Sequence, residues 1–237
     1  MKIFVIKLSN TVKIILSLVI VGLVCFGGYQ LVWQGMVKPA FAPKSPIFQG
    51  SPESKKIAFT CNVAWGNEEL PKMLDIFEKN NIRITFFLEG RWAENYPELA
   101  KQLAEKHEIG NHGYGHKHHN ALSLEGNLEE IKKGQEAIEK VTGIKTVLFA
   151  PPYGEWSEKV VQAAGELNHL TIMWSIDTID WQRPAPTTIH QRVVEKAHNG
   201  AIILMHPVEQ TVAALPGIIK ELKAAGYEIV PVSELLK

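Results

Sequence analysis

The segment from Ile57 to Leu88, IAFTCNVAWGNEELPKMLDIFEKNNIRITFFL, contains one complete strand–helix–strand unit. Residues 57–61 form a short apolar run typical of a buried strand, and residues 83–88 form a second. Between them, apolar side chains recur every three or four residues, at Leu70, Met73, Leu74 and Phe77. The Asn80-Asn81 pair is expected to end this helix. The segment therefore predicts two neighbouring strands joined by a helix.

The same alternation continues to the end of the chain. The expected strands are Ile57–Cys61, Arg83–Leu88, Glu108–Asn111, Val147–Ala150, Thr171–Trp174, Ala201–Met205 and Tyr227–Val230. The expected later helices are Glu125–Val141 (capped by Ser123 and stopped by Gly143), Ser157–Leu167, Thr188–Ala197 and Val212–Ala225. Repeated strand–helix units imply right-handed crossovers and a mainly parallel sheet. We therefore predict an α/β fold with about seven parallel strands, an incomplete (β/α) barrel rather than one of eight strands.

Composition narrows the classes of partner and cofactor. The 237 residues include 25 Lys+Arg and 25 Asp+Glu, so the formal net charge is +0. A general nucleic-acid-binding protein would need surplus positive charge, so no nucleic-acid partner is expected. The chain has 2 cysteines, Cys25 and Cys61, and Cys25 lies in a membrane-like segment. No structural disulfide or cysteine zinc site is therefore expected, and any metal must be held by histidines and carboxylates.

The amino terminus predicts a membrane anchor over residues 1–37. Three lysines precede a continuous apolar stretch, Ile14–Phe26, and no further charge appears before Lys38. We expect one transmembrane helix with its amino end in the cytoplasm and the rest of the protein outside. The alternative is a secreted protein cleaved after Ala40-Phe41-Ala42, which Pro43 makes less favourable.

Residues 38–55 are rich in proline, serine and lysine and predict an extended linker. The globular domain is then expected over residues 56–237, and we expect it to be monomeric.

Polar or ring-bearing side chains follow six of the expected strands. Because active sites of parallel β/α folds form at the carboxyl ends of strands, these side chains predict one shared site. His112 and His116 are four residues apart and can face one metal ion, for which zinc is well suited. The alternative is a solvated histidine-rich loop, since Lys117, His118 and His119 follow at once.

Three further residues are candidates for acid–base chemistry. His206 ends a buried strand, and Asp177 and Asp180 follow the preceding one. A histidine with an acidic partner can act as a general acid near neutral pH. The alternatives are a hydrogen-bonded structural histidine and a turn in which Asp180 is a cap.

A proline-rich loop over residues 149–154 presents an aromatic ring. The two prolines, Pro151 and Pro152, stiffen the loop, and Tyr153 together with Trp181 can wall a sugar-binding groove. The alternative is a loop that packs on the rim of the barrel.

Taken in order, these motifs resemble the polysaccharide deacetylases, the NodB-type domain of the family 4 carbohydrate esterases, over nearly all of residues 56–237. The residues that match are His112 and His116 of the metal motif, Pro151-Pro152-Tyr153 of the proline loop, Asp177, Asp180 and Trp181 of the Asp-x-x-Asp-Trp motif, and Leu204 and His206 of the Leu-x-His motif. The resemblance is greatest to membrane-anchored, sporulation-associated members. It implies a distorted (β/α) barrel, a divalent metal such as zinc on His112 and His116, and a cell-wall polysaccharide as partner.

The first motif departs from the family pattern. Asn62 and Val63 stand where the family has a catalytic-base Asp and a metal-ligand Asp, and Ala150 stands where it has an Arg that orients the base. An amide cannot take a proton from water at neutral pH, and valine cannot bind a metal. The hypothesis from sequence is that Glu89, at the end of the second strand, supplies the missing carboxylate. Further candidates are Asp177, Asp180, Glu155 and Glu68.

Three functions are compatible with these residues. The first is metal-dependent hydrolysis of acetyl groups from a peptidoglycan or chitin-like glycan, with His206, Asp177, Asp180 and Glu89 as catalytic residues. The second is a catalytically silent glycan-binding module, and the third is a structural role at the membrane. The expected sugar-contacting residues are Tyr153, Trp181, Pro152 and Trp65.

Overall fold

The computed structural model describes residues 45–237, so the anchor predicted over residues 1–37 lies outside the described part. The central strand is β1 (Lys56–Val63), which pairs in parallel with β2, β7 and β8. Residues 57–63 are all buried, which explains why this strand is a nearly continuous apolar run instead of an alternating one. Within residues 45–237, no helix is long and apolar enough to cross a membrane.

The sheet is parallel and runs in the order β5-β4-β3-β2-β1-β7-β6, with β8 added beside β1. The remaining strands are β2 (Thr85–Leu88), β3 (Glu108–Asn111), β4 (Leu148–Phe149), β5 (Leu170–Thr171), β6 (Ile176–Asp177), β7 (Ile202–Met205) and β8 (Glu228–Val230). Strands β5 and β6 lie at opposite ends of this order, yet only residues 172–175 separate them. The sheet must therefore curl until its ends approach each other, which confirms the predicted incomplete barrel. The run expected to give one strand at Thr171–Trp174 instead supplies β5 and leads into β6.

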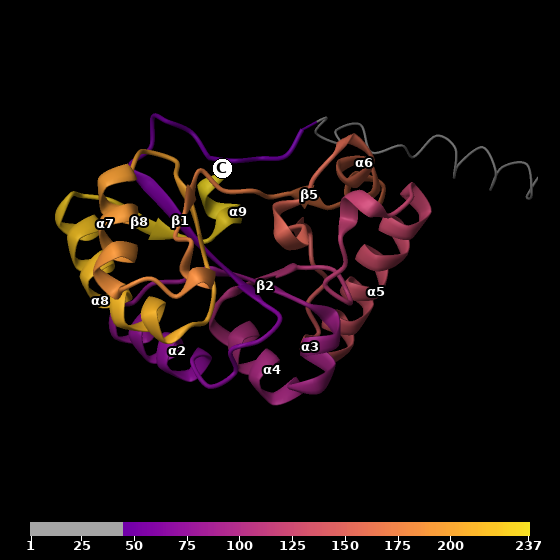
Figure 1. The fold of residues 1–237 in the computed structure, drawn as a ribbon, viewed down its shortest axis with the longest axis horizontal. Helices are drawn as coiled ribbons and strands as arrows, with labels where there is room; N and C mark the ends of the chain where they lie inside the picture. The colour runs from indigo at the N-terminus through magenta and orange to yellow at the C-terminus, as the bar shows by residue number, and fades with distance from the viewer. Residues whose placement is uncertain (1–44) are drawn as a thin grey trace, which may run out of the picture. The chain divides into compact units, whose positions relative to one another are not determined.

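Seven helices of residues 45–237 cover the outside of the curled sheet (Figure 1). They are α2 (Leu70–Lys79), α3 (Gly90–Asn95), α4 (Pro97–Lys106), α5 (Leu124–Thr142), α6 (Glu158–Glu166), α7 (Pro186–Lys196) and α8 (Glu209–Ala224). The short helix α9 (Val232–Leu235) instead packs in the apolar cluster that contains Ala58 and Phe87. The expected ends of α5 are confirmed: the Ser123 hydroxyl accepts from the Gly126 N–H, and Gly143 takes the left-handed conformation at φ 73°. Three short 3₁₀ turns, His119–Ala121, Pro152–Gly154 and Asp180–Gln182, follow strands β3, β4 and β6.

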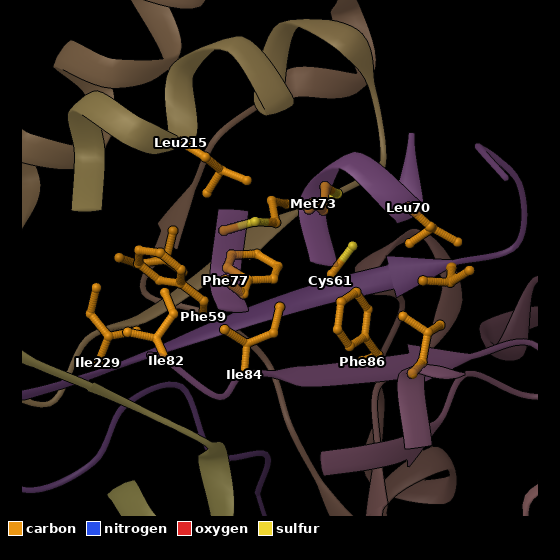
Figure 2. Close-up of a cluster of buried hydrophobic side chains, with 14 of the residues drawn as sticks. Phe59, Cys61, Leu70, Met73, Phe77, Ile82, Ile84, Phe86, Leu215 and Ile229 are labelled. Carbon is orange, nitrogen blue, oxygen red and sulfur yellow. The ribbon is translucent and has the colours of Figure 1, made fainter. Parts of the chain in front are cut away.

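Alternate residues of β1 belong to different apolar clusters. Phe59 and Cys61 pack into the main cluster with the inward faces of α2 and α8, as Figure 2 shows with Met73 and Leu215. Ala58 packs in a second cluster with Phe87. Successive side chains of a strand point to opposite faces. The odd positions of β1 therefore face the helix layer, and the even positions face the interior of the barrel.

Residues 47–50 belong to the folded part, although the sequence places them in the linker. Ile47 forms a parallel bridge with Ile172, and Gln49 forms an antiparallel bridge with Ala201. The Gly50 N–H donates to the Gly200 carbonyl at 2.7 Å. This strap, as residues 47–50 are called below, occupies the gap between the end of β5 and the start of β7. Its four residues, Ile47-Phe48-Gln49-Gly50, are too few to carry a periodic signal, so sequence pattern alone does not reveal the pairing.

Folding stability is expected to fall as the pH drops from about 6.5 to about 4. Burial, as the first cause, lowers the pKa of His107 and of His169 to about 4 from the usual 6.5. In this window the unfolded chain binds protons that the folded chain does not, so acid favours unfolding. Each histidine contributes on the order of 1–3 kcal/mol to the loss. Urea denaturation at a series of pH values measures it.

The double variant His107→Gln/His169→Gln should flatten this pH dependence, whereas His118→Gln, at an exposed side chain, should leave it unchanged. An equally steep loss of stability in the double variant would contradict the assignment.

Candidate functional site

A cavity of about 400 Å³ lies at the carboxyl ends of the central strands. Its lining comes from segments far apart in the chain: Asn62, Ala64, Trp65, His112, His116, Tyr153, Gly154, Trp174, Asp177, Trp181, Leu204 and His206. The expectation that the strand-end motifs share one site is therefore met by the geometry of the described residues.

His112 and His116 lie side by side in this cavity. Their ring centroids are 5.1 Å apart at 69°. His112 Nδ1 is 2.7 Å from the carbonyl oxygen of Ala150, so Nδ1 carries the proton and Nε2 is the free nitrogen. Burial, and next the neighbouring His116, hold the pKa of His112 well below its usual value. His112 is therefore a neutral imidazole whose free Nε2 can accept a hydrogen bond or bind a metal.

His206 is held by Asp180 rather than by Asp177. Asp180 is fully buried, and its Oδ1 lies 2.7 Å from His206 Nδ1. Its Oδ2 accepts from the His206 backbone N–H and from the Thr211 hydroxyl, both at 2.6 Å. The two hydrogen bonds to His206 fix the orientation of its ring, and the Thr211 hydroxyl holds the carboxylate in place. Within residues 45–237, His206 Nε2 makes no hydrogen bond to another residue. Asp180 thus positions His206 without lining the cavity itself.

Asp177 lines the cavity and shapes the loop that follows β6. Its Oδ1 accepts from the Ile179 N–H at 2.7 Å, and Ile179 adopts a left-handed conformation at φ 52°. The two aspartates of this motif therefore have different surroundings: Asp180 is committed to His206, and Asp177 faces the cavity.

Asn62 and Val63 differ in their surroundings as the alternation of β1 requires. The Asn62 side chain lines the cavity, and its Oδ1 is buried without a hydrogen-bond partner. Val63 is fully buried in the main apolar cluster. Ala150 is buried and contributes its carbonyl to His112. The wall of the cavity formed by β1 and the start of the proline loop therefore carries neither a carboxylate nor a guanidinium.

The described residues do not fit a catalytic zinc site. Catalytic zinc normally has three protein ligands, whereas residues 45–237 contain no group of three His, Cys, Asp or Glu side chains that could hold a metal ion. The pair His112 and His116 has the right chemistry for two ligands, and their role in metal binding stays a prediction. The family that the sequence resembles is generally metal-dependent, so the missing third ligand is a departure from that resemblance.

Glu89 does not line the cavity, although the sequence makes it the candidate for the missing carboxylate. It lies at the start of α3 and is mostly buried. Burial raises the pKa of Glu89, the charge of Arg91 opposes that rise, and the charge of Glu130 adds to it. The Glu89 backbone N–H donates to the Val63 carbonyl, and the next residue, Gly90, donates to the Gly113 carbonyl. The hypothesis that Glu89 replaces the family's aspartate has no support in this geometry.

Exposed aromatic side chains surround the cavity. Tyr153 and Trp181 are more than half exposed and line it, as expected for sugar-contacting residues. Trp65 also lines it and stacks on the His206 ring, with centroids 5.8 Å apart at 8°. Gly66 at φ +83° permits this arrangement, because a Cβ there would lie 2.2 Å from the Pro207 carbonyl oxygen. Pro152 is buried next to Tyr153 and is not among the residues that line the cavity, and its contact with a sugar stays a prediction.

Sequence reasoning missed the support of the histidine loop. Glu130 of α5 is almost fully buried; it accepts from the Gly115 N–H and forms an ion pair with Lys117 at 3.0 Å. An acidic residue on the inward stripe of an amphipathic helix, next to Ile131, is a signal that could have identified it. His119 is buried too and bonds to Asn127 at 2.6 Å, so the loop is not simply a solvated histidine tract.

The model of the family described as Polysaccharide deacetylase matches residues 49–172. The uncharacterized protein YlxY of Bacillus subtilis (strain 168) is 45% identical over 205 residues, which cover 84% of this chain and 64% of that protein. The chain thus spans slightly less than two thirds of that relative. A peptidoglycan-N-acetylglucosamine deacetylase of Bacillus cereus is 32% identical over 196 residues, covering 80% of this chain and 71% of that protein.

Among solved structures, the wild-type form of a CE4 family pseudoenzyme from Bacillus anthracis is 43% identical with a TM-score of 0.81, covering 82% of this chain and 70% of that chain. A mutant of the same pseudoenzyme, 41% identical, is described as having restored enzymatic activity. The fold, the strand-end histidines and these matches agree. The chain belongs to the polysaccharide deacetylase family.

Proposed function

We propose that this protein binds an N-acetylated cell-wall glycan in the cavity without removing the acetyl group. The observation that carries the proposal is the buried, unpartnered Oδ1 of Asn62 in the cavity wall. A buried polar atom without a partner is costly, so it favours a ligand that supplies a hydrogen-bond donor. The N–H of an acetamido group is such a donor.

The missing hydrolytic groups support the same proposal. An amide at position 62 cannot act as a general base, and the two cavity histidines lack a third metal ligand among the described residues. The relative named as a peptidoglycan deacetylase supports a cell-wall glycan as the ligand class. The relative described as a pseudoenzyme supports the absence of turnover.

A second candidate is metal-dependent hydrolysis of acetyl groups from the same glycan. It is favoured by one observation, the ordered pair of His206 and Asp180 beside His112 and His116. In that reading, His206 would protonate the leaving amine. Among the residues that line the cavity, Asp177 is the one carboxylate that could activate water in that reading.

The test separates the two candidates in one preparation of the full chain. Calorimetric titration with a chitin-type oligomer should show binding, and an analogue that carries acetoxy groups in place of the acetamido groups, and so lacks the N–H donor, should bind at least about tenfold more weakly, as expected for one unmade buried hydrogen bond. Asn62→Ala should remove that preference, with Asn67→Ala as the control at an amide that bonds to Trp92. Stoichiometric zinc together with acetate release that His112→Ala abolishes would instead establish the second candidate.

We further propose that the protein acts at the outer face of the cell membrane. The apolar stretch Ile14–Phe26, preceded by lysines, supports an anchor with the folded part outside. Protease treatment of intact protoplasts checks this, because only an external domain is digested.

A further inference from the structure

We propose that Phe48 and Trp156 form an outer subsite that stacks against a further pyranose ring of the same glycan. This inference rests on the proposed glycan binding in the cavity and extends it to the chain length of the ligand. Phe48 belongs to the strap, and Trp156 follows the turn at Pro152–Gly154.

The two rings form an exposed aromatic pair. Their centroids are 6.0 Å apart at 72°, an edge-to-face arrangement, and each residue is 39% exposed. Aromatic rings are rigid and bury large areas at small entropic cost. A pyranose ring presents flat patches of C–H groups that suit such a surface, while its hydroxyls stay in water.

The pair is continuous with the cavity through its wall. The Ile47 carbonyl, one residue before Phe48, accepts from the Met173 N–H at 2.8 Å, and the next residue, Trp174, lines the cavity. On the other side, Gly154 also lines the cavity and lies against Trp174, since a Cβ there would be 2.6 Å from Trp174 Cη2. Trp156 is two residues beyond Gly154. The wall formed by Gly154 and Trp174 therefore joins the cavity to the pair.

The loop between Tyr153 and Trp156 is fixed before any ligand arrives. The Glu155 carboxylate lies 2.9 Å from His118 Nδ1 and accepts from the Asn120 N–H. The His118 ring stacks on Tyr153, with centroids 4.1 Å apart at 9°. Binding to a preorganised surface avoids the entropic cost of ordering it.

The cavity is too small to hold a polymer, so most of a bound glycan chain must lie outside it. A volume of about 400 Å³ is near the lower end of small-molecule sites, which span roughly 300–1,000 Å³. A glycan with one acetylated sugar in the cavity must continue over the rim. The aromatic pair beside the Gly154 and Trp174 wall is placed to receive the next part of the chain.

The test compares a short with a long N-acetylglucosamine oligomer, the dimer and the hexamer, by calorimetric titration of the full chain. Trp156→Ala and Phe48→Ala should each weaken hexamer binding about 3- to 10-fold, the effect expected of one aromatic contact, and leave dimer binding unchanged. Tyr96→Ala is the matched control, because Tyr96 is an exposed aromatic that does not line the cavity. Thermal denaturation establishes that the variants fold.

The outcomes distinguish a failure of the outer subsite from a failure of glycan binding in the cavity. Equal losses for dimer and hexamer, or no loss for either, would overturn the subsite while leaving glycan binding in place. If the unaltered chain binds neither oligomer, the proposed function fails and the subsite fails with it.

Discussion

The double variant Asn62→Asp/Val63→Asp is expected to bind a divalent metal and to release acetate from an acetylated glycan. The Asn62 side chain already faces the cavity beside His112 and His116, so an isosteric carboxylate there can serve as a base. Position 63 is where the family has a metal-ligand aspartate. Because the Val63 side chain packs on the helix side of β1, an aspartate there must turn out of the apolar cluster, at the end of the strand, to become the third protein ligand that catalytic zinc usually requires. A positioned general base contributes roughly 10²- to 10⁴-fold to a rate. Zinc content and acetate release measure the gain.

Stability measurements provide the internal control for this gain. Val63 is fully buried in the main apolar cluster, so Val63→Asp should lower the melting temperature when a chelator is present. Added zinc should restore it, because a ligand that binds only the folded state stabilises that state. Each single variant should remain inactive, since one lacks the base and the other lacks the ligand. A double variant that zinc does not stabilise would contradict the prediction.

Asp180→Ala is expected to destabilise the fold by about 3–5 kcal/mol, because it takes a buried acceptor away from three hydrogen-bond donors at once. The carboxylate is fully buried and accepts from the backbone and ring of His206 and from the Thr211 hydroxyl. Its removal leaves these donors without acceptors in a region from which water is excluded. The free energy of unfolding, obtained from urea denaturation, measures the loss.

Asp177→Ala is the matched control from the same motif. Asp177 is only partly buried and accepts from one N–H, that of Ile179, so about 1 kcal/mol is expected. The effects on glycan binding should rank the other way: Asp177→Ala should weaken binding more than Asp180→Ala does, because Asp177 lines the cavity and Asp180 does not. Equal stability losses for the two alanine variants would show that the His206 contacts of Asp180 are not the cause.

The repeating strand–helix pattern predicts most of the fold because buried parallel strands and amphipathic helices carry local signals. The division of one run into β5 and β6 is not predictable in this way. It depends on pairing between strands: Thr171 pairs with β4, and Ile176 pairs with β7. This choice of partners is a consequence of the curl of the whole sheet. The pairing of Ile47 with Ile172 is nonlocal for the same reason.

The candidate site is predictable where a residue type carries the chemistry and follows a strand. His112, His116 and His206 meet both conditions, and the structure brings them to one cavity. Glu89 also meets both, yet its carboxylate lies near Arg91 and Glu130. The strand-end position specifies an edge of the sheet but not the direction of a side chain, which for Glu89 depends on its place at the start of α3.

The strap has a practical consequence for anyone who prepares this protein. A chain shortened to begin at Lys56 would lose Ile47 and leave the Met173 N–H and the Thr171 carbonyl without their present partners. Unpaired strand edges recruit strands from other molecules. Such a shortened protein should therefore self-associate in solution through the exposed end of β5, and solubility would depend on keeping a few residues that look like a spacer.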